Sequence, residues 1–285
     1  MDNMSNQLNT SDVPNVLSIA GTDPTGGAGV QADIKTISAC GGYAMSVITA
    51  VVAQNTTGVQ QVELMPVSLI EAQLDSVFDD VQVDAVKIGM LGDADIICAV
   101  AKKLRHYQQK YQQQQRTFVI VLDPVMVAKS GDRLLADTAI KALKEELMPL
   151  VSLVTPNLPE AGDLLGQAQA DDLDAMQRQA KQFTVPVYLK GGHLSSTGLA
   201  DEQACDVLVS EHHQQWFFSQ RIATHNTHGT GCTLSAAIAT YLAKGMSMND
   251  ACQSAKNYLT DALRHADELN VGKGQGPVHH FFKSA

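Results

Sequence analysis

The chain reads Thr224-His225-Asn226-Thr227-His228-Gly229-Thr230-Gly231-Cys232-Thr233 at the point where a glycine-rich turn leads into an apolar helix. Beyond this turn Leu234, Ile238 and Leu242 recur at helical spacing, which predicts a helix that begins at about Gly229. The first N–H groups of a helix have no partner within it, and that end of the helix dipole is positive. Glycines there let an anion approach the backbone closely. The segment therefore indicates a cradle for a phosphate or an oxyanion, with a glycine-rich loop that merely begins a helix as the alternative.

The composition limits the class of protein. The chain has 285 residues, long for one domain but common for an α/β fold, and 45% of them are hydrophobic, which is enough for a sizeable core. The formal net charge of -10 argues against sequence-independent binding to DNA or RNA, so we expect no nucleic-acid partner. Anionic substrates remain compatible with this charge, because backbone amides and a bound metal can supply local positive charge.

The N-terminus and the cysteines indicate a cytoplasmic protein without a membrane partner. Residues 1–12 are polar and resemble no signal peptide, and the most apolar stretch, residues 47–53, is far too short to cross a bilayer. We expect residues 1–13 to form a disordered tail and residues 14–285 to form a single domain. The cysteines are odd in number, scattered and without CxxC spacing, so they indicate neither a disulfide framework nor a zinc site: Cys40, Cys98, Cys205, Cys232 and Cys252.

Short apolar runs alternate with helical patterns along the chain. Because strands covered on both faces show apolar runs without alternation, this order predicts an α/β fold with a mostly parallel sheet. The predicted strands are residues 16–20, 47–53, 85–88, 119–122, 151–155 and 186–190, and residues 203–209 and 215–219 are expected to form an antiparallel hairpin at one edge. The predicted helices are residues 28–39, a helix marked by Ile70, Leu74, Val77 and Phe78, and residues 96–104, 134–148, 158–165 and 171–183. The glutamine-rich stretch 105–117 is expected to end a helix in an exposed loop.

The residues best suited to chemistry come directly after these strands. In parallel sheets ligands bind at the carboxyl ends of the strands, so the shared placement is stronger evidence than any one motif. The segments concerned are Gly21-Thr22-Asp23, Gln54-Asn55, Gly89-Met90-Leu91, Asp123-Pro124-Val125, Thr155-Pro156-Asn157 and Lys190-Gly191-Gly192.

The glycine-rich loop at residues 21–29 is neither a P-loop nor a GxGxxG fingerprint, because Gly27 stands where a P-loop has lysine. Its small residues still permit a ligand to approach the backbone, and Asp23 offers a carboxylate at the mouth of the strand. The alternative is that Asp23-Pro24 is simply turn chemistry.

Asn157 and Glu160 stand three residues apart where a helix is expected to begin. Oxygen ligands of this kind, with several waters, suit Mg²⁺ bound to phosphates. An N-cap followed by an acidic residue in the first turn explains the same pattern, and the two interpretations stay open.

Four further residues have alternative interpretations. Lys190 follows a strand and can face a phosphate, whereas Asp123 can act on metal-bound water or cap a turn. Gln54 can both donate and accept, which suits the edge of an aminopyrimidine, although a buried structural glutamine fits equally well. Met90 can cover a flat ring or fill the core. The histidine pairs 212–213 and 279–280 are expected to be solvated.

Together and in this order, these segments resemble the ribokinase-like superfamily and, more narrowly, the hydroxymethylpyrimidine/phosphomethylpyrimidine kinases of thiamine biosynthesis. The similarity extends over about residues 15 to 282. Besides the segments above, it is carried by Ile19 to Gly29, Thr49 to Thr56, Lys87 to Leu91, Asp123 to Met126, Thr155 to Glu160, Lys190 to His193, His228 to Cys232 and the tail from Gly272 to His280.

The resemblance implies a three-layer sandwich without a separate lid domain, assembled as a homodimer. It implies that the γ-phosphoryl group of ATP is transferred first to the hydroxymethyl group of 4-amino-5-hydroxymethyl-2-methylpyrimidine and then to the monophosphate. Gln54 would bind the pyrimidine edge, with Gly21, Asp23, Met90 and Val125 around it. Asn157 and Glu160 would organise Mg²⁺, partly through water, and Lys190 and Asp123 would belong to the ATP side. The backbone amides of Gly229, Thr230, Gly231 and Cys232 would form the anion hole.

Cys232 departs from the wider superfamily, in which most sugar and nucleoside kinases carry aspartate as the base. A helix N-terminus lowers the pKa of a thiol, whereas a nearby triphosphate raises it, so the residues alone leave the net effect open. The hydroxymethyl group must lose a proton, but a phosphate monoester, with a second pKa of about 6, is already largely ionised. We therefore expect Cys232→Ala to slow the first phosphorylation more than the second.

Three other functions compete with this one. A pyridoxal-type kinase, or an enzyme with both activities, is the nearest, because a pyridine alcohol has a similar size and the same reacting group. A regulatory protein that only binds the pyrimidine is disfavoured by Asn157, Glu160, Lys190 and the glycines of residues 229–231. A dehydrogenase is disfavoured because the dinucleotide fingerprint is missing.

Overall fold

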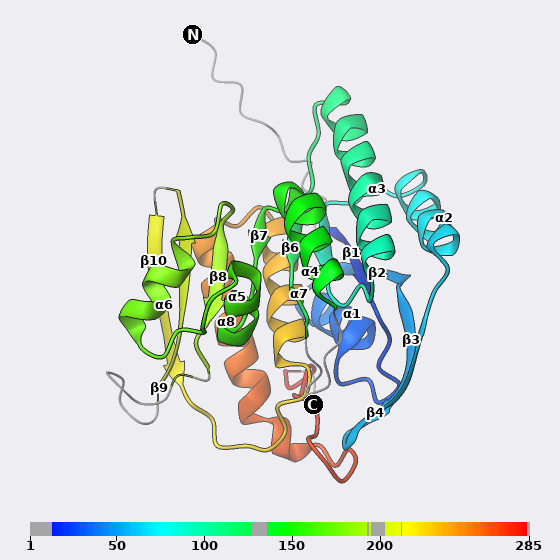
Figure 1. Ribbon diagram of the computed structural model, residues 1–285. Coiled ribbons are helices and arrows are strands. Elements are labelled where there is room, and N and C mark those ends of the chain that lie inside the picture. The colour runs from blue at the N-terminus through cyan, green and yellow to red at the C-terminus, as the bar shows by residue number, and fades with distance from the viewer. Residues whose placement is uncertain (1–12, 127–135, 193, 195–202, 212, 284–285) are drawn as a thin grey trace.

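The computed structural model describes residues 13–126, 136–192, 194, 203–211 and 213–283. Within them a central sheet has the strand order β10-β9-β8-β7-β6-β5-β1-β2 (Figure 1). The pairs from β2 to β8 are parallel, and β9 and β10 add an antiparallel edge, as predicted. The strands are β1 (Asn15–Ala20), β2 (Tyr43–Ile48), β5 (Ala85–Ile88), β6 (Val119–Leu122), β7 (Leu153–Val154), β8 (Val187–Lys190), β9 (Gln203–Ser210) and β10 (His213–Gln220).

Helices cover both faces of this sheet, which gives three layers (Figure 1). Alternate residues of one strand serve the two faces. Ile120 and Leu122 pack under one layer and Val121 under the other, so each face has its own apolar core. One layer holds α2 (Val67–Phe78), α3 (Ala94–Gln113), α4 (Asp137–Ala142), α5 (Leu158–Leu165) and α6 (Leu173–Ala180), and the other holds α1 (Gly29–Ala39), α7 (Thr230–Ala243) and α8 (Met248–Arg264).

The single strand predicted at residues 47–53 is wrong. The chain bends at Thr49, which is fully buried and donates from its hydroxyl to the carbonyl of Met90 at 2.7 Å. After the bend, β3 (Ala50–Asn55) pairs with β4 (Gly58–Leu64) in a separate two-stranded antiparallel sheet. We call this sheet, residues 50–64, the flap. A continuous apolar run across the bend hid the change of sheet.

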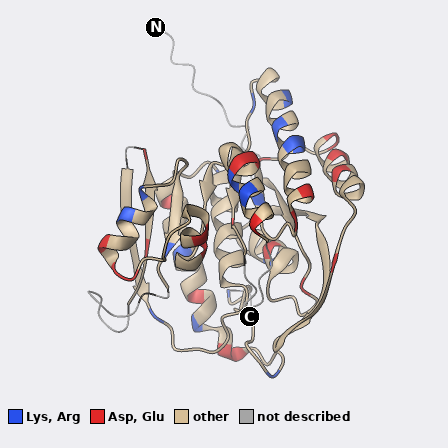
Figure 2. Ribbon diagram, viewed as in Figure 1, with Lys and Arg blue, Asp and Glu red and all other residues tan. Residues whose placement is uncertain are grey.

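The loop predicted at residues 105–117 is also wrong over most of its length, because α3 continues to Gln113. Tyr107 and Tyr111 lie on its buried face, and the ring of Tyr107 stacks on Phe78 with centroids 4.4 Å apart. Figure 2 shows that acidic residues of α2 lie beside basic residues of α3, and Lys103 pairs with Asp75 of α2 at 2.6 Å. Neighbours distant in sequence therefore extend a helix whose polar composition suggested a loop.

Smaller differences concern the ends of elements. The helix predicted at 134–148 is α4 followed by a π-helical turn (Leu143–Leu147) and a 3-10 turn (Met148–Leu150), and residues 134–135 lie outside the described residues. The helix α8 was not predicted. The expected tail also lies outside the described residues except for Val13. No helix in the described ranges combines the length and apolarity needed to cross a membrane.

Candidate active site

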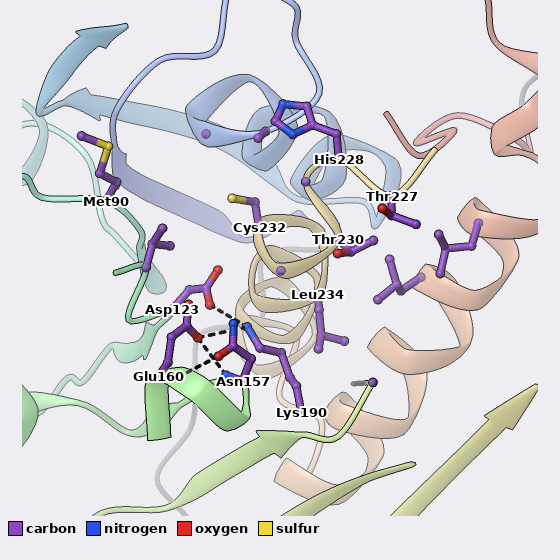
Figure 3. A pocket seen from close by; sticks show the side chains of 18 of the residues that line it. Met90, Asp123, Asn157, Glu160, Lys190, Thr227, His228, Thr230, Cys232 and Leu234 are labelled. Atoms are coloured by element: carbon purple, nitrogen blue, oxygen red, sulfur yellow. Dashed lines mark hydrogen bonds and ion pairs between the residues drawn. The ribbon is translucent and has the colours of Figure 1, made fainter. Parts of the chain in front are cut away.

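The carboxyl ends of the parallel strands open into one pocket with a volume of about 730 Å³. The loops that follow β1, β5, β6, β7 and β8, the flap and the start of α7 all contribute to its wall, and Figure 3 shows several of these side chains around the beginning of α7. All but one of the predicted site residues line it: Gly21, Gln54, Met90, Asp123, Val125, Asn157, Glu160, Lys190, Gly229, Thr230, Gly231 and Cys232. Residues far apart in the sequence are thus brought together as predicted.

The first turn of α7 presents free backbone amides to this pocket. The N-cap residue of α7 is Gly229, with φ of 79°, and no side chain caps the backbone amides of the first turn. A Cβ at Gly229 would collide with the carbonyl oxygen of Gly27, so only glycine allows the two loops to approach this closely. The uncapped amides and the positive end of the helix dipole suit an anion.

A cluster of three charged side chains lies beside these amides. Lys190 Nζ is 2.9 Å from Asp123 Oδ1 and 3.9 Å from Glu160 Oε2. Burial raises the pKa of Glu160 to about 7, against the attraction of Lys190 and together with the repulsion of Asp123. The same carboxylates hold the pKa of Lys190 above its ordinary value although burial lowers it. One lysine facing two carboxylates leaves an excess of negative charge at neutral pH.

Asn157 and Glu160 form a capping box at the start of α5. The amide oxygen of Asn157 accepts from the backbone of Glu160 at 2.8 Å, and Glu160 Oε2 accepts from the backbone of Asn157 at 2.8 Å. The N-cap interpretation is therefore present in the structure. The described residues include no group of three or more histidine, cysteine and acidic side chains placed to hold a metal. The carboxylates of Asp123 and Glu160 fit a Mg²⁺ ion that takes most of its ligands from phosphates and water, rather than a cage made by the protein.

The opposite wall of the pocket is apolar and is built largely by the flap. Val52 and Gln54 of β3 and Val59 and Val62 of β4 line it. The pairing of β4 shifts by one residue at Gln60, so that Val59 and Val62, three positions apart, both face the pocket. The amide of Gln54 lies between this apolar wall and the carboxylate of Asp23, whose pKa it lowers, and the sulfur of Met90 packs close to Gly21. Such a wall suits a flat heterocycle with a polar edge.

Asp23 is the predicted site residue that does not line the pocket. It is fully buried and accepts from the backbone amides of Thr25 at 2.9 Å and Ala28 at 2.7 Å, and its Oδ2 lies 2.7 Å from Nε2 of His228. Burial raises its pKa, but the hydrogen bonds from His228 and Thr25 outweigh this and hold the pKa well below its ordinary value. These contacts organise the loop of residues 21–29, and a contact with substrate stays a prediction.

Cys232 lines the pocket as a thiol. Burial raises its pKa to about 11; the charge of Lys87 lowers the pKa, and the charges of Asp33 and Asp123 raise it. The thiol is therefore protonated at neutral pH in the free protein, and a role for Cys232 as a base stays a prediction.

Sequence reasoning missed two buried ion pairs at the pocket wall. Lys87 pairs with Asp33 at 2.8 Å, and both side chains are fully buried. Asp206 accepts from Lys256 at 2.6 Å and from the hydroxyl of Tyr188 at 2.9 Å. A charged residue inside an otherwise apolar strand, as in Ala85-Val86-Lys87-Ile88, was the available signal.

The prediction that both histidine pairs are solvated is wrong for His280. That side chain is 5% exposed, its Nε2 lies 3.1 Å from the hydroxyl of Thr233, and burial lowers its pKa to about 3. His213 is exposed and His279 half-buried, whereas His212 lies outside the described residues.

Comparison with known proteins shows that this chain is similar to kinases. Residues 23–279 match the phosphomethylpyrimidine kinase family. The hydroxymethylpyrimidine/phosphomethylpyrimidine kinase of Escherichia coli (strain K12) is 51% identical over 271 residues, which are 94% of this chain and 97% of that protein. The ADP complex of Bacillus subtilis pyridoxal kinase is similar with a TM-score of 0.82 at 36% identity, over 94% of this chain and 97% of that one. The phosphomethylpyrimidine kinase of Clostridium difficile 630 has a TM-score of 0.74 at 39% identity, over 88% of this chain and 99% of that one.

Proposed function

This chain belongs to the phosphomethylpyrimidine kinase family, and from that premise we propose that it phosphorylates 4-amino-5-hydroxymethyl-2-methylpyrimidine to the monophosphate and then to the diphosphate, with ATP as donor. The observation that carries the proposal is the shared pocket. The uncapped amides of residues 229–232 and the side chain of Gln54 line the same cavity, with Lys190 beside the amides. A phosphate and a heterocycle therefore fit in it together.

The geometry supports a division of labour between the two walls. Gln54 pairs with the polar edge of the pyrimidine, while Met90 and Val125 cover its ring. The attacking oxygen forms a bond to the γ-phosphorus as the bond to the β–γ bridging oxygen breaks. This transfer depends mainly on positioning and charge stabilisation, which the amides of α7 and Lys190 provide. The high pKa of the Cys232 thiol leaves little thiolate at neutral pH, so stabilisation by the amides dominates.

Asp123 and Glu160 are the residues that would hold Mg²⁺, with Asn157 nearby through water, and the ion supplies charge neutralisation for the phosphates. The pocket also extends to the segment after β10 and to α8, where Ile222, Leu259 and Leu263 form an apolar lining. This part supports binding of the adenine base.

A second activity is favoured by the similarity to Bacillus subtilis pyridoxal kinase. Pyridoxal and the pyrimidine share a flat aromatic ring and a reacting CH₂OH group. The wall that faces the ring is mostly apolar, so few hydrogen-bonding groups of the ring have to match it. We therefore include pyridoxal and pyridoxine as alternative or additional substrates.

The test is a coupled assay of ATP consumption, with the products identified by mass. Wild-type protein is expected to consume ATP with the pyrimidine and to form the mono- and diphosphate in sequence. Turnover on pyridoxine but not on the pyrimidine would replace the first proposal by the second, and turnover on neither would reject both. Light scattering in the same buffer tests the homodimer expected of this family, and fractionation of cells tests the cytoplasmic location.

A further inference from the structure

The C-terminal segment returns from α8 to the flap. We call residues 272–280 the strap; Figure 1 shows it, in red, beside the end of the flap. Two successive amides of the strap bind the turn between β3 and β4, because the backbone of Gly274 donates to Thr56 Oγ1 at 3.0 Å and that of Gln275 donates to the carbonyl of Thr56 at 2.9 Å. A Cβ on Gly274 would collide with the carbonyl oxygen of Thr56, so the approach requires glycine there. Thr56 lies two residues beyond Gln54.

The next residues of the strap bind the loop that leads into α7. The amide of Gly276 donates to Asn226 Oδ1 at 3.1 Å, and its carbonyl accepts from the backbone of His228 at 3.0 Å. His228 also forms a parallel bridge with Pro277. His228 directly precedes Gly229, so the strap is bonded to the residue that positions the first free amide of the anion hole.

The strap is anchored in the core beyond these contacts. Val278 is fully buried, and the carbonyl of His280 accepts from the hydroxyl of Tyr258 on α8 at 2.7 Å. The flap, in contrast, has only two strands, and several of its side chains are exposed. Two-stranded sheets are marginally stable alone, so the flap takes its position from what holds it. At its base the amide of Val52 donates to Thr22 Oγ1 at 2.9 Å, and at its tip it is held by the strap.

We propose that the strap is a positioning element that fixes Gln54 on the flap relative to the amides at the start of α7. The proposal rests on the proposed kinase function, because it assigns the strap the task of setting the separation between the pyrimidine and the transferred phosphate. Reacting groups must lie within a narrow range of distance and angle, and a displacement of about 1 Å can cost about a hundredfold in rate. Neither Thr56 nor Asn226 lines the pocket, so both act through the strap.

The test is a double-mutant cycle that cuts the strap at each end. Thr56→Val keeps the shape of the side chain but removes the acceptor for Gly274. Asn226→Asp keeps an acceptor for Gly276 and loses the donor to Ala266 and Asp267, whereas Asn226→Ala removes both, so the difference between these two variants reports the bond to the strap. Thr56→Val and Asn226→Ala are each expected to lower kcat/KM for the pyrimidine about tenfold, with KM for ATP unchanged. Because the strap acts as one connection between the flap and the start of α7, weakening either end is expected to loosen it, and the double variant is expected to lose little more than either single one. Independent losses would multiply to about a hundredfold and would overturn the proposal.

Two control variants separate positioning from general damage. Thr56→Ser retains the hydroxyl and is expected to recover wild-type kcat/KM, and Gln61→Ala alters an exposed side chain of β4 and is expected to change nothing. A Thr56→Ser variant as impaired as Thr56→Val would overturn the proposal.

Hydrogen exchange of the β3 and β4 amides gives a readout that needs no turnover. Faster exchange in Thr56→Val, confined to the flap, supports the strap, and unchanged exchange overturns it. If wild-type protein shows no pyrimidine-dependent turnover, the proposed function fails while this measurement still decides the role of the strap.

Discussion

Lys87 and Lys190 both line the pocket but differ in the number of carboxylates that they face. Lys87 on β5 pairs with Asp33, both side chains are 0% exposed, and the hydroxyl of Ser18 donates to Asp33 at 2.6 Å. Lys190, at the end of β8, is 16% exposed and faces both Asp123 and Glu160. The first pair has one carboxylate for one ammonium, and both side chains are fully buried. The second cluster has two carboxylates for one ammonium and is partly open to solvent, and at neutral pH Glu160 is about half protonated.

The difference separates stability from function. A buried ion pair whose charges balance resists removal of either partner, because the other is left uncompensated. In the cluster at Lys190, burial and the neighbouring charge of Asp123 raise the pKa of Glu160. A group with a shifted pKa at the wall of a pocket is typical of a functional site. The comparison teaches that the number of carboxylates around a lysine and its access to solvent together indicate which lysine takes part in chemistry.

The largest effect is expected from Lys87→Met. Loss of the ammonium leaves the buried charge of Asp33 uncompensated, with only the hydroxyl of Ser18 as a hydrogen-bond donor, which costs about 3–5 kcal/mol in the free energy of unfolding. Urea denaturation measures it. The double variant Lys87→Met with Asp33→Asn is expected to recover much of the loss. If Lys87→Met kept its stability but lost activity, Lys87 would have a functional role like that of Lys190, and the contrast between a stabilising and a functional lysine would be wrong.

Lys190→Met is expected to lower kcat by about 10²- to 10³-fold, because a charge beside the transferred phosphate is lost. The measurement is the initial rate of ATP consumption with saturating pyrimidine. Stability to urea is expected to change far less than in Lys87→Met. As a matched control, Lys103→Met breaks a partly exposed pair with Asp75 on the outer helices and is expected to leave kcat unaltered.

The pH dependence of stability sharpens the comparison further. In the free protein the pKa of Glu160 is about 7, against an ordinary value of 4.5. The protonated form is therefore favoured by folding, so its contribution is fully present below about pH 4.5 and is lost as the pH rises through about 7. The loss amounts to roughly 3 kcal/mol. Urea denaturation between pH 4.5 and 8, without metal or nucleotide, is expected to show this decline in wild type and to lack it in Glu160→Gln. Parallel curves would contradict the assignment.

Cys232 interacts electrostatically with both Lys87 and Lys190. Its substitution is expected to have the smallest effect of the four. Because its thiol has a pKa of about 11, Cys232→Ala is expected to slow the first phosphorylation by about tenfold or less and the second by still less. Rates measured separately on the hydroxymethyl and the monophosphate substrates decide this. Equal slowing of both steps would remove Cys232 from any role as a base.

The parallel sheet and most of the pocket were predictable, because they depend on local patterns. Apolar runs marked the strands, and the small and polar residues after them marked the edge where a ligand binds. Gln54 and Lys190 were found in this way, and Gly229 was found from the glycines at the start of an apolar helix. The principle at work is geometric, since parallel strands end at a common edge.

The features that were predicted wrongly or not at all depend on contacts between segments distant in the sequence. Nothing local to Val47–Ala53 reveals that Thr49 bends to reach the carbonyl of Met90. The length of α3 depends on the partners of Tyr107 on α2. The strap was noticed only as a similar tail, because backbone bonds between Gly274 and Thr56 leave no periodic trace. The acidic residue Asp206 was overlooked because its partner, Lys256, is on a helix that was not predicted.

The extra residue in β4 has a consequence for how pockets of this kind diversify. Gln60 is the extra residue of a β-bulge, and this bulge places Val59 on the same side of the strand as Val62. Deleting that one position would restore regular alternation, rotate Val59 outward and remove a piece of the apolar wall, without touching any residue that contacts phosphate. A change in chain length at a single site in a hairpin can therefore reshape ring selectivity while the transfer machinery stays intact. Specificity in this architecture can drift by insertion and deletion as readily as by replacement of side chains.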